Sequence, residues 1–181
     1  MKSTLAYKPS QSGFAKLAAI LFTFTCALSI STCWSKTYGD ATVKRIVRVY
    51  DGDTFTADID AFSFTTKDGK KKVLKDLHPV ISEAMNIRIF GIDTPEMKSK
   101  SEKVRRWAIK ARDRARALLN AAKEVILTNI GKDKYFRFDA TVWVDGHNLG
   151  QTLIDEGLAL PYDGGKKADW EAHLDEQSDQ S

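Results

Sequence analysis

Cysteine and histidine are scarce in this sequence, and their scarcity excludes several classes of protein. The 181 residues include two cysteines and three histidines. Two cysteines are too few for a scaffold held by several disulfides or for a four-thiolate zinc site. The histidines stand at 78, 147 and 173, which is not the spacing of a zinc enzyme. No run of twenty apolar residues occurs, which excludes a protein with several membrane-spanning helices.

The overall composition is that of a folded chain. Hydrophobic residues make up 43% of the sequence and charged residues 29%, which is too apolar for a disordered protein. A body of about 145 residues suits one domain that buries roughly two thirds of its unfolded surface. We expect three parts: a targeting segment over residues 1–35, a globular domain over residues 36–175, and a polar tail over residues 176–181.

The N-terminal segment has the pattern of a secretory signal. Three lysines and no acidic residue precede a fifteen-residue apolar run from Leu17 to Ser31, which is too short to span a bilayer comfortably. We expect a secreted or periplasmic protein. The alternatives are an uncleaved membrane anchor and a buried helix of a cytosolic protein. Both cysteines lie in or beside this segment, so disulfides do not hold the domain together.

Charge is divided unevenly along the domain. Residues 98–137 contain 13 basic and four acidic residues, whereas residues 138–181 contain two basic and ten acidic ones. A basic block of this kind suits a polyanionic partner, and it equally suits a solvated helix face.

The hydrophobic pattern predicts a mixed β protein with α-helices. Strands are expected over residues 43–50, 54–60, 86–93, 124–130 and 136–144. Helices are expected over 98–122, 149–156 and 166–174, with a short helix inside 74–85. Because the first strands follow in hairpin order and helices interrupt the later ones, the pattern favours a small closed or partly closed barrel with packed helices.

Two aspartates end strand-like segments and are candidate metal ligands. Asp53 follows the tight turn that begins at Asp51 and Gly52, and Asp93 ends the strand that begins at residue 86. Two carboxylates that meet at a barrel rim repel each other unless a cation lies between them. Oxygen ligands without nearby histidine or cysteine point to Ca²⁺ or Mg²⁺. The simpler interpretation of Asp51-Gly52 is a hairpin turn.

Two arginines are candidates for binding a phosphate. Arg88 lies within an apolar strand, and its side chain points either into a pocket or to solvent; Arg137 has the same ambiguity. Converging guanidiniums match phosphate oxygens and stabilise the charge that gathers on phosphorus in the transition state. Glu96 follows Pro95, which restricts the backbone before it.

The order of these motifs resembles the staphylococcal nuclease-like (thermonuclease) family. The motifs are Asp-Gly-Asp-Thr at 51–54, Arg-Ile-Phe-Gly-Ile-Asp-Thr-Pro-Glu at 88–96, Asp-Lys-Tyr-Phe-Arg at 133–137 and Gly-Leu-Ala at 157–159. The resemblance runs from about residue 43 to residue 170. It implies a five-stranded OB-fold barrel with packed helices and Ca²⁺-dependent hydrolysis of DNA and RNA that leaves 3′-phosphate ends.

The resemblance also implies roles for individual residues. Asp53 and Asp93 would bind Ca²⁺ by their side chains and Thr94 by its backbone carbonyl, with Asp51 as an outer acid. Arg88 and Arg137 would hold the scissile phosphate, and Glu96 would position or deprotonate the attacking water. The remaining carried-over positions, which would contact a neighbouring phosphate, are Lys134 and Tyr135.

Three departures from the family pattern affect the substrate side. Phe136 stands where the family often has glycine, and residues 61–85 are longer than the equivalent turn of the best-known member. Tyr162 is a counterpart, at a shifted spacing, of an aromatic residue after Gly-Leu-Ala.

Three functions are compatible with this sequence. The first is a monomeric Ca²⁺-dependent nuclease that acts on DNA, RNA or both. The second is a non-catalytic OB-fold module that binds nucleic acid or a protein. The third is a structural protein of the cell envelope. The complete set of acids and arginines favours the nuclease, since binding alone does not need it.

Overall fold

A computed structural model describes residues 37–133, 135 and 137–179 of the chain. The predicted signal segment therefore lies outside the described residues, as do Lys134 and Phe136.

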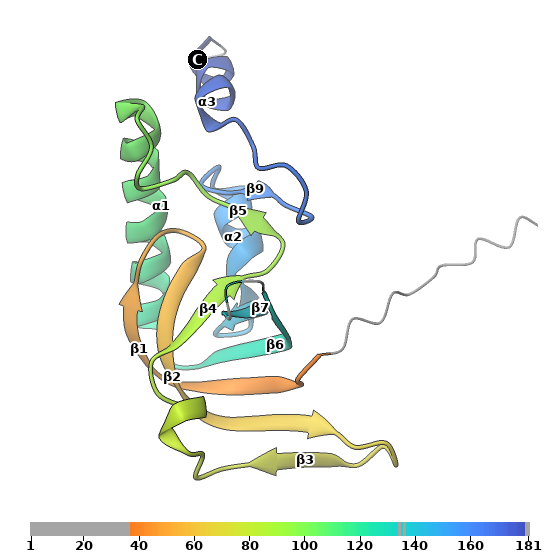
Figure 1. The fold of residues 1–181 in the computed structure, drawn as a ribbon. Coiled ribbons are helices and arrows are strands. Elements are labelled where there is room, and N and C mark those ends of the chain that lie inside the picture. The colour runs from red at the N-terminus through yellow and green to blue at the C-terminus, as the bar shows by residue number, and fades with distance from the viewer. Residues whose placement is uncertain (1–36, 134, 136, 180–181) are drawn as a thin grey trace, which may run out of the picture. The chain divides into compact units, whose positions relative to one another are not determined.

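Five strands close into a barrel, as the sequence predicts (Figure 1). Around the barrel the order is β1, β6, β7, β4 and β2, and β2 pairs again with β1. The β4–β7 pair is parallel and the other pairs are antiparallel. The five strands are β1 (Asp40–Val49), β2 (Thr54–Thr65), β4 (Met85–Ile89), β6 (Val125–Lys132) and β7 (Phe138–Val144).

Helices and short strands surround this barrel. The helices are α1 (Glu102–Ala121), α2 (Leu149–Asp155), α3 (Trp170–Asp179) and the single 3₁₀ turn η1 (Pro79–Ile81). The short strands are β3 (Lys71–Leu74), which pairs with β2; β8 (His147–Asn148), which pairs with β7; and β5 (Ile92–Asp93), which pairs with β9 (Leu160–Pro161). None of the helices in the described part of the chain is long and apolar enough to cross a membrane.

The hydrophobic core fills the barrel and continues under α1. Alternate residues of the strands point inward, among them Phe55, Ile87 and Leu127, and each is at most 1% exposed. The buried stripe of α1 has the predicted helical spacing and consists of Val104, Ala108, Ala111, Ala115 and Leu119. A smaller cluster attaches α3, because Trp170 and Leu174 pack against the first turn of α1.

Three predicted elements differ from the structure. The strand expected over 86–93 is two strands, because the chain turns at Gly91, whose φ of 82° favours glycine. The helix expected inside 74–85 is only η1, and β3 takes up its first residue. The last helix begins at Trp170, since the Asp169 carboxylate accepts the backbone N–H groups of two residues in its first turn. It continues through residue 179, into the stretch given above as a tail.

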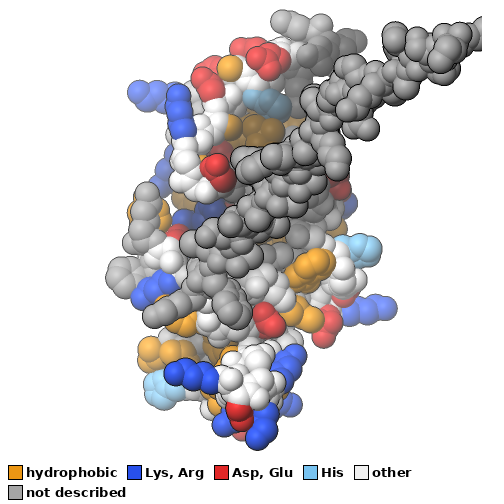
Figure 2. Space-filling view, turned by 90° about the vertical axis from the view of Figure 1, so that its right-hand side faces the viewer, with side chains coloured by type: hydrophobic (Ala, Val, Ile, Leu, Met, Phe, Trp, Pro, Cys, Tyr) orange, Lys and Arg blue, Asp and Glu red, His pale blue; other side chains and the backbone are white. Residues whose placement is uncertain are grey.

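The last four residues of β2 and strand β3 form an antiparallel pair that we call the β2–β3 arm, residues 62–74. All four residues of β3 are exposed. Basic side chains gather at the lower end of the molecule, where the arm lies (Figure 2).

Candidate active site

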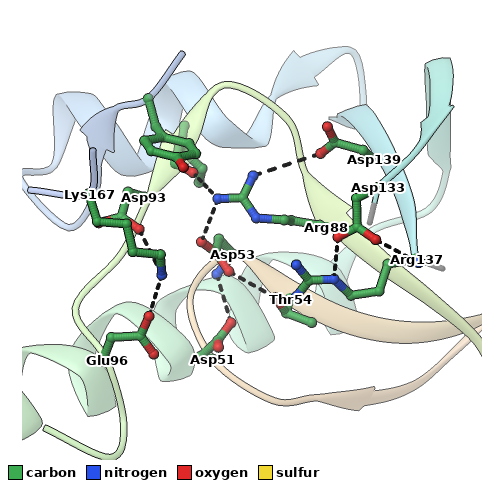
Figure 3. A network of polar contacts seen from close by, with 12 residues as sticks. Asp51, Asp53, Thr54, Arg88, Asp93, Glu96, Asp133, Arg137, Asp139 and Lys167 are labelled. Atoms are coloured by element: carbon green, nitrogen blue, oxygen red, sulfur yellow. Dashed lines mark hydrogen bonds and ion pairs between the residues drawn. The ribbon is translucent and has the colours of Figure 1, made fainter. Parts of the chain in front are cut away.

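The barrel brings three of the predicted motifs to one end of β2. Residue Thr54 begins β2 and lies opposite Arg88 of β4 in the antiparallel register. Arg88 in turn lies opposite Asp139 of β7, one strand further. Arg137 immediately precedes β7, so its side chain reaches the same rim (Figure 3). Motifs more than eighty residues apart in sequence therefore meet because β4 pairs with both β2 and β7.

The turn at residues 51–53 is held tightly against its neighbours. A Cβ atom at Gly52 would lie 2.8 Å from the Ala111 side chain of α1 and 2.8 Å from the Thr94 side chain. Only glycine fits such a close approach. The interpretation of Asp51-Gly52 as a turn is confirmed: the Tyr50 N–H donates to the Thr54 carbonyl at 2.9 Å. The turn thereby fixes Asp53 beside the segment that carries Asp93 and Thr94.

Arg88 points into the site, which settles the ambiguity left by the alternation of its strand. Its side chain is only 12% exposed. Nη2 donates to the Ile92 carbonyl at 2.9 Å and lies 3.5 Å from Oδ2 of Asp53. Nη1 lies 3.8 Å from Oδ1 of Asp139, and the guanidinium stacks on the ring of Tyr162 at 5.2 Å. The guanidinium is therefore fixed in position by contacts on several sides.

Arg137 approaches the same strand end from the other side. Its Nη1 donates to the Thr54 hydroxyl at 3.4 Å, and that hydroxyl donates to Asp53 at 2.8 Å. Asp133 orients it by accepting its backbone N–H at 2.9 Å and its Nε–H at 2.8 Å. Burial opposes ionisation of Asp133, but these hydrogen bonds outweigh it and lower the pKa of the carboxyl. Tyr135 is exposed and stacks its ring on the Arg137 guanidinium at 5.3 Å.

Asp93 belongs to a second set of contacts at this rim. It is 2% exposed, and the indole N–H of Trp170 donates to its Oδ2 at 3.0 Å. The Lys167 ammonium lies 3.2 Å from Oδ1 of Asp93 and also hydrogen-bonds to Oε1 of Glu96. Figure 3 shows Lys167 between these two carboxylates and Asp53 between Arg88 and Asp51. Glu96 itself is exposed and accessible to water.

Comparison with known proteins identifies the family. A family model described as "Staphylococcal nuclease homologue" matches residues 86–180, more than half of the chain. The chain belongs to the staphylococcal nuclease homologue family.

The relatives that this chain resembles are named as nucleases. The chain is 31% identical over 116 residues to the thermonuclease of Staphylococcus hyicus, which covers 64% of this chain and 56% of that protein. It is 35% identical over 100 residues to endonuclease YncB of Bacillus subtilis strain 168, covering 52% and 47%. A prophage-derived endonuclease of the same strain, YokF, is 39% identical over 75 residues, covering 40% and 25%. The chain thus spans about half the length of the first two relatives and 25% of the third.

The oxygen-rich chemistry of the site fits the hard cation that the family resemblance implies. Oδ1 of Asp93 is buried and contacts a cationic group, the Lys167 ammonium, and Asp53 is only 6% exposed. Burial, and then repulsion by Asp53, raises the pKa of Asp51 to about 7. Among the described residues, however, no three acidic, histidine or cysteine side chains are grouped as a complete ligand set. Water and substrate oxygens would have to complete the coordination, as is common for Mg²⁺ and Ca²⁺.

Several residues that shape the site had no role assigned to them from the sequence, although Asp133 stands in the motif at 133–137. Asp133 and Asp139 hold the two arginines, and Tyr162, noted above only for its spacing, covers Arg88. The position of Asp139 in β7, two residues after Arg137, is a local clue. Lys167 and Trp170 are more than seventy residues from Asp93, so no local pattern could have indicated them. Lys134 lies outside the described residues.

Proposed function

We propose that this protein is a Ca²⁺-dependent nuclease that cleaves phosphodiester bonds of DNA, RNA or both. The observation that carries the proposal is that two arginines approach one acidic strand end from opposite sides, Arg88 at Asp53 and Arg137 at Thr54. Guanidiniums fixed in this way bind the oxygens of a phosphate diester in bidentate fashion. The family membership supports the same conclusion.

The residues would divide the reaction between them. Asp53 and Asp93, with the backbone carbonyl of Thr94, would hold the cation, and Asp51 would lie outside them. When bound, the cation supplies Lewis-acid stabilisation of the phosphate oxygens. Glu96, which is exposed to water, would orient the attacking water and accept its proton.

The chemistry requires one bond to form and one to break at phosphorus. The water oxygen bonds to phosphorus while the bond to the 5′-oxygen breaks, so the products carry a 3′-phosphate and a 5′-hydroxyl. Arg88 and Arg137 would stabilise the negative charge that accumulates on the phosphate oxygens in the transition state. Asp133 and Asp139 would keep both guanidiniums aimed at that position.

Hydrolysis of a labelled oligonucleotide by the full chain tests the proposal. We expect single-stranded DNA or RNA to be cut with Ca²⁺ and not with a chelator. Treatment with a 3′-phosphatase should then slow the migration of the 5′-labelled products. A folded protein that binds the oligonucleotide without cutting it, across several divalent ions, would instead favour the non-catalytic OB-fold module.

We further propose that the protein is exported, on the pattern of its first 35 residues, and that it acts as a monomer. Mass spectrometry of the protein from its own cells would give an N-terminus near residues 30–36 if the signal is removed. An intact Met1 would favour the uncleaved anchor.

A further inference from the structure

One cation of the chain already contacts the acidic side of the candidate site. Lys167 lies between β9 and α3, and its ammonium contacts both Asp93 and Glu96 (Figure 3). Glycines precede it at 164 and 165, and the side chain is about half exposed.

The segment that carries Lys167 is attached to the rim at both ends. At its start, the Tyr162 N–H donates to the Gly91 carbonyl at 2.9 Å. At its end, the Trp170 indole donates to Asp93 at 3.0 Å, and the Trp170 ring is buried against α1. These two attachments, on residues 91 and 93, position the intervening lysine over the carboxylates. The contact therefore follows from the path of the backbone as well as from the reach of a long side chain.

Asp93 depends on Lys167 for charge compensation. Its Oδ2 accepts from Trp170, whereas its buried Oδ1 lies 3.2 Å from the Lys167 ammonium. Within the described residues, Lys167 is the only cation within 4 Å of this carboxylate. A buried carboxylate without a compensating cation is costly. The oxygen that Lys167 neutralises is thus one that a divalent cation would also need.

We propose that Lys167 determines the metal affinity of the site, because its ammonium competes with a divalent cation for the carboxylates of Asp93 and Glu96. The inference rests on the proposed function insofar as Asp93 is a metal ligand. Lys167 gives the site a resident positive charge that binding of a metal has to displace. Metal affinity is lower by the free energy of that contact, so a higher metal concentration is needed to fill the site.

The surroundings give the displaced ammonium a place to go. A surface cavity of about 590 Å³ adjoins Lys167 and is lined by Asp169, Glu171 and Lys166 among others. The Lys167 side chain can turn within this cavity, whose lining holds acidic residues and lysines in equal number, without moving the buried Trp170. Displacement therefore requires a side-chain rotation and no disruption of the core.

Calorimetric titration of the full chain with CaCl₂ tests the proposal without any hydrolysis measurement. We expect Lys167→Met to bind Ca²⁺ at least about tenfold more tightly than the natural protein. In that variant no ammonium neutralises the carboxylates of Asp93 and Glu96, so their full negative charge attracts the ion. Lys167→Arg keeps the positive charge and should stay within about threefold of the natural affinity. Lys166→Met is the matched control, because Lys166 is exposed beside the same cavity and forms no ion pair with any residue that the structure describes; it should leave affinity unchanged.

Thermal unfolding supplies a second readout. In chelator, Lys167→Met should unfold at a lower temperature than the natural protein, and Ca²⁺ should raise its midpoint by more. If Lys167→Met does not fold, Lys167→Gln replaces it.

Unchanged or weaker Ca²⁺ binding by the neutral variants overturns the inference and leaves the proposed nuclease intact. Absence of Ca²⁺ binding in every variant overturns the inference and also the calcium requirement, while hydrolysis of the oligonucleotide would still decide the reaction class.

Discussion

The two ends of strand β2 carry charge in opposite ways. At the beginning of β2, Asp53 is 6% exposed and pairs with Arg88, whose side chain is 12% exposed. At the other end, the β2–β3 arm exposes four lysines, and among the described residues only one of them, Lys70, forms an ion pair, with Asp68 at 3.3 Å. Twelve residues at about 3.3 Å each separate the two ends by at most roughly 40 Å.

The glycine turns at the two ends differ in the same way. Gly52, at the site, is required by space, because two side chains leave no room for a Cβ. Gly69, at the tip of the arm, has nothing within 4 Å and is favoured only by its φ of 79°. Buried charges and close contacts make each partner at the site end costly to lose. On the arm, water and salt screen the charges.

The largest effect is expected for Arg137→Ala. Removing a donor that stabilises the transition state lowers turnover by about 10²–10³. Arg137 is the cleaner of the two arginines to test, because its side chain is 25% exposed against 12% for Arg88, and its partner Asp133 keeps two backbone N–H donors when the guanidinium is lost. Steady-state hydrolysis of an oligonucleotide measures the effect, and urea unfolding checks that the fold is kept. Turnover within tenfold of the natural value would reject the assigned role.

Gly52→Ala should destabilise the protein by about 1–3 kcal/mol, because the added methyl group overpacks the contact with α1 and Thr94. Urea unfolding gives the free energy of unfolding directly. The control is Gly131→Ala, where the nearest atom to a new Cβ is 3.7 Å away. Equal stability of the two variants would mean that the backbone at Gly52 shifts at little cost to accommodate the methyl group. The turn at the site would then tolerate substitution as well as the turn of the arm does.

The sequence predicted the barrel and the local motifs because both depend on short-range patterns. The stripe from Val104 to Leu119 fixed α1, and the acids at strand ends marked the rim. Alternation could not decide where Arg88 points, since the answer depends on the parallel pairing of β4 with β7. The break at Gly91 was missed because the apolar residues on either side continue the pattern of a strand.

The contacts of Asp93 with Lys167 and Trp170 lay beyond sequence reasoning for a different reason. They form only after α3 docks on α1 and the segment between β9 and α3 returns to the rim. Such contacts depend on tertiary packing across more than seventy residues. The general lesson is that strand-end motifs indicated which residues gather, whereas their partners depended on the assembled fold.

An exposed ion pair outside both ends of β2 shows how little an exposed pair is expected to contribute to stability. Arg114 of α1 donates two short hydrogen bonds to Glu156, at 2.6 and 2.8 Å, and these lower the pKa of Glu156 below its usual 4.5. Because both side chains are about a third or more exposed, Glu156→Gln should cost only about 0.2–1 kcal/mol.

The cost should depend on pH in a defined direction. A pKa that is lower in the folded state means that the stabilisation is complete above pH 4.5 and is lost as pH falls through the folded value. Urea unfolding of the natural protein and of Glu156→Gln at pH 7 and near pH 3 measures this difference. A difference that grew toward low pH would contradict the assigned pair.

The smallest effect is expected from the largest change in charge. Replacing the four arm lysines, Lys67, Lys70, Lys71 and Lys72, by glutamine should alter the free energy of unfolding by less than about 0.5 kcal/mol, since their side chains are exposed and nearly free of acidic partners. The matched variant at the other end is Arg88→Gln. That single change leaves Asp53 and Asp139 without their buried cation and should cost about 3–5 kcal/mol. Urea unfolding of both variants compares four exposed charges with one buried charge. If the arm variant lost as much stability as Arg88→Gln, exposure would not be what separates the two ends of β2.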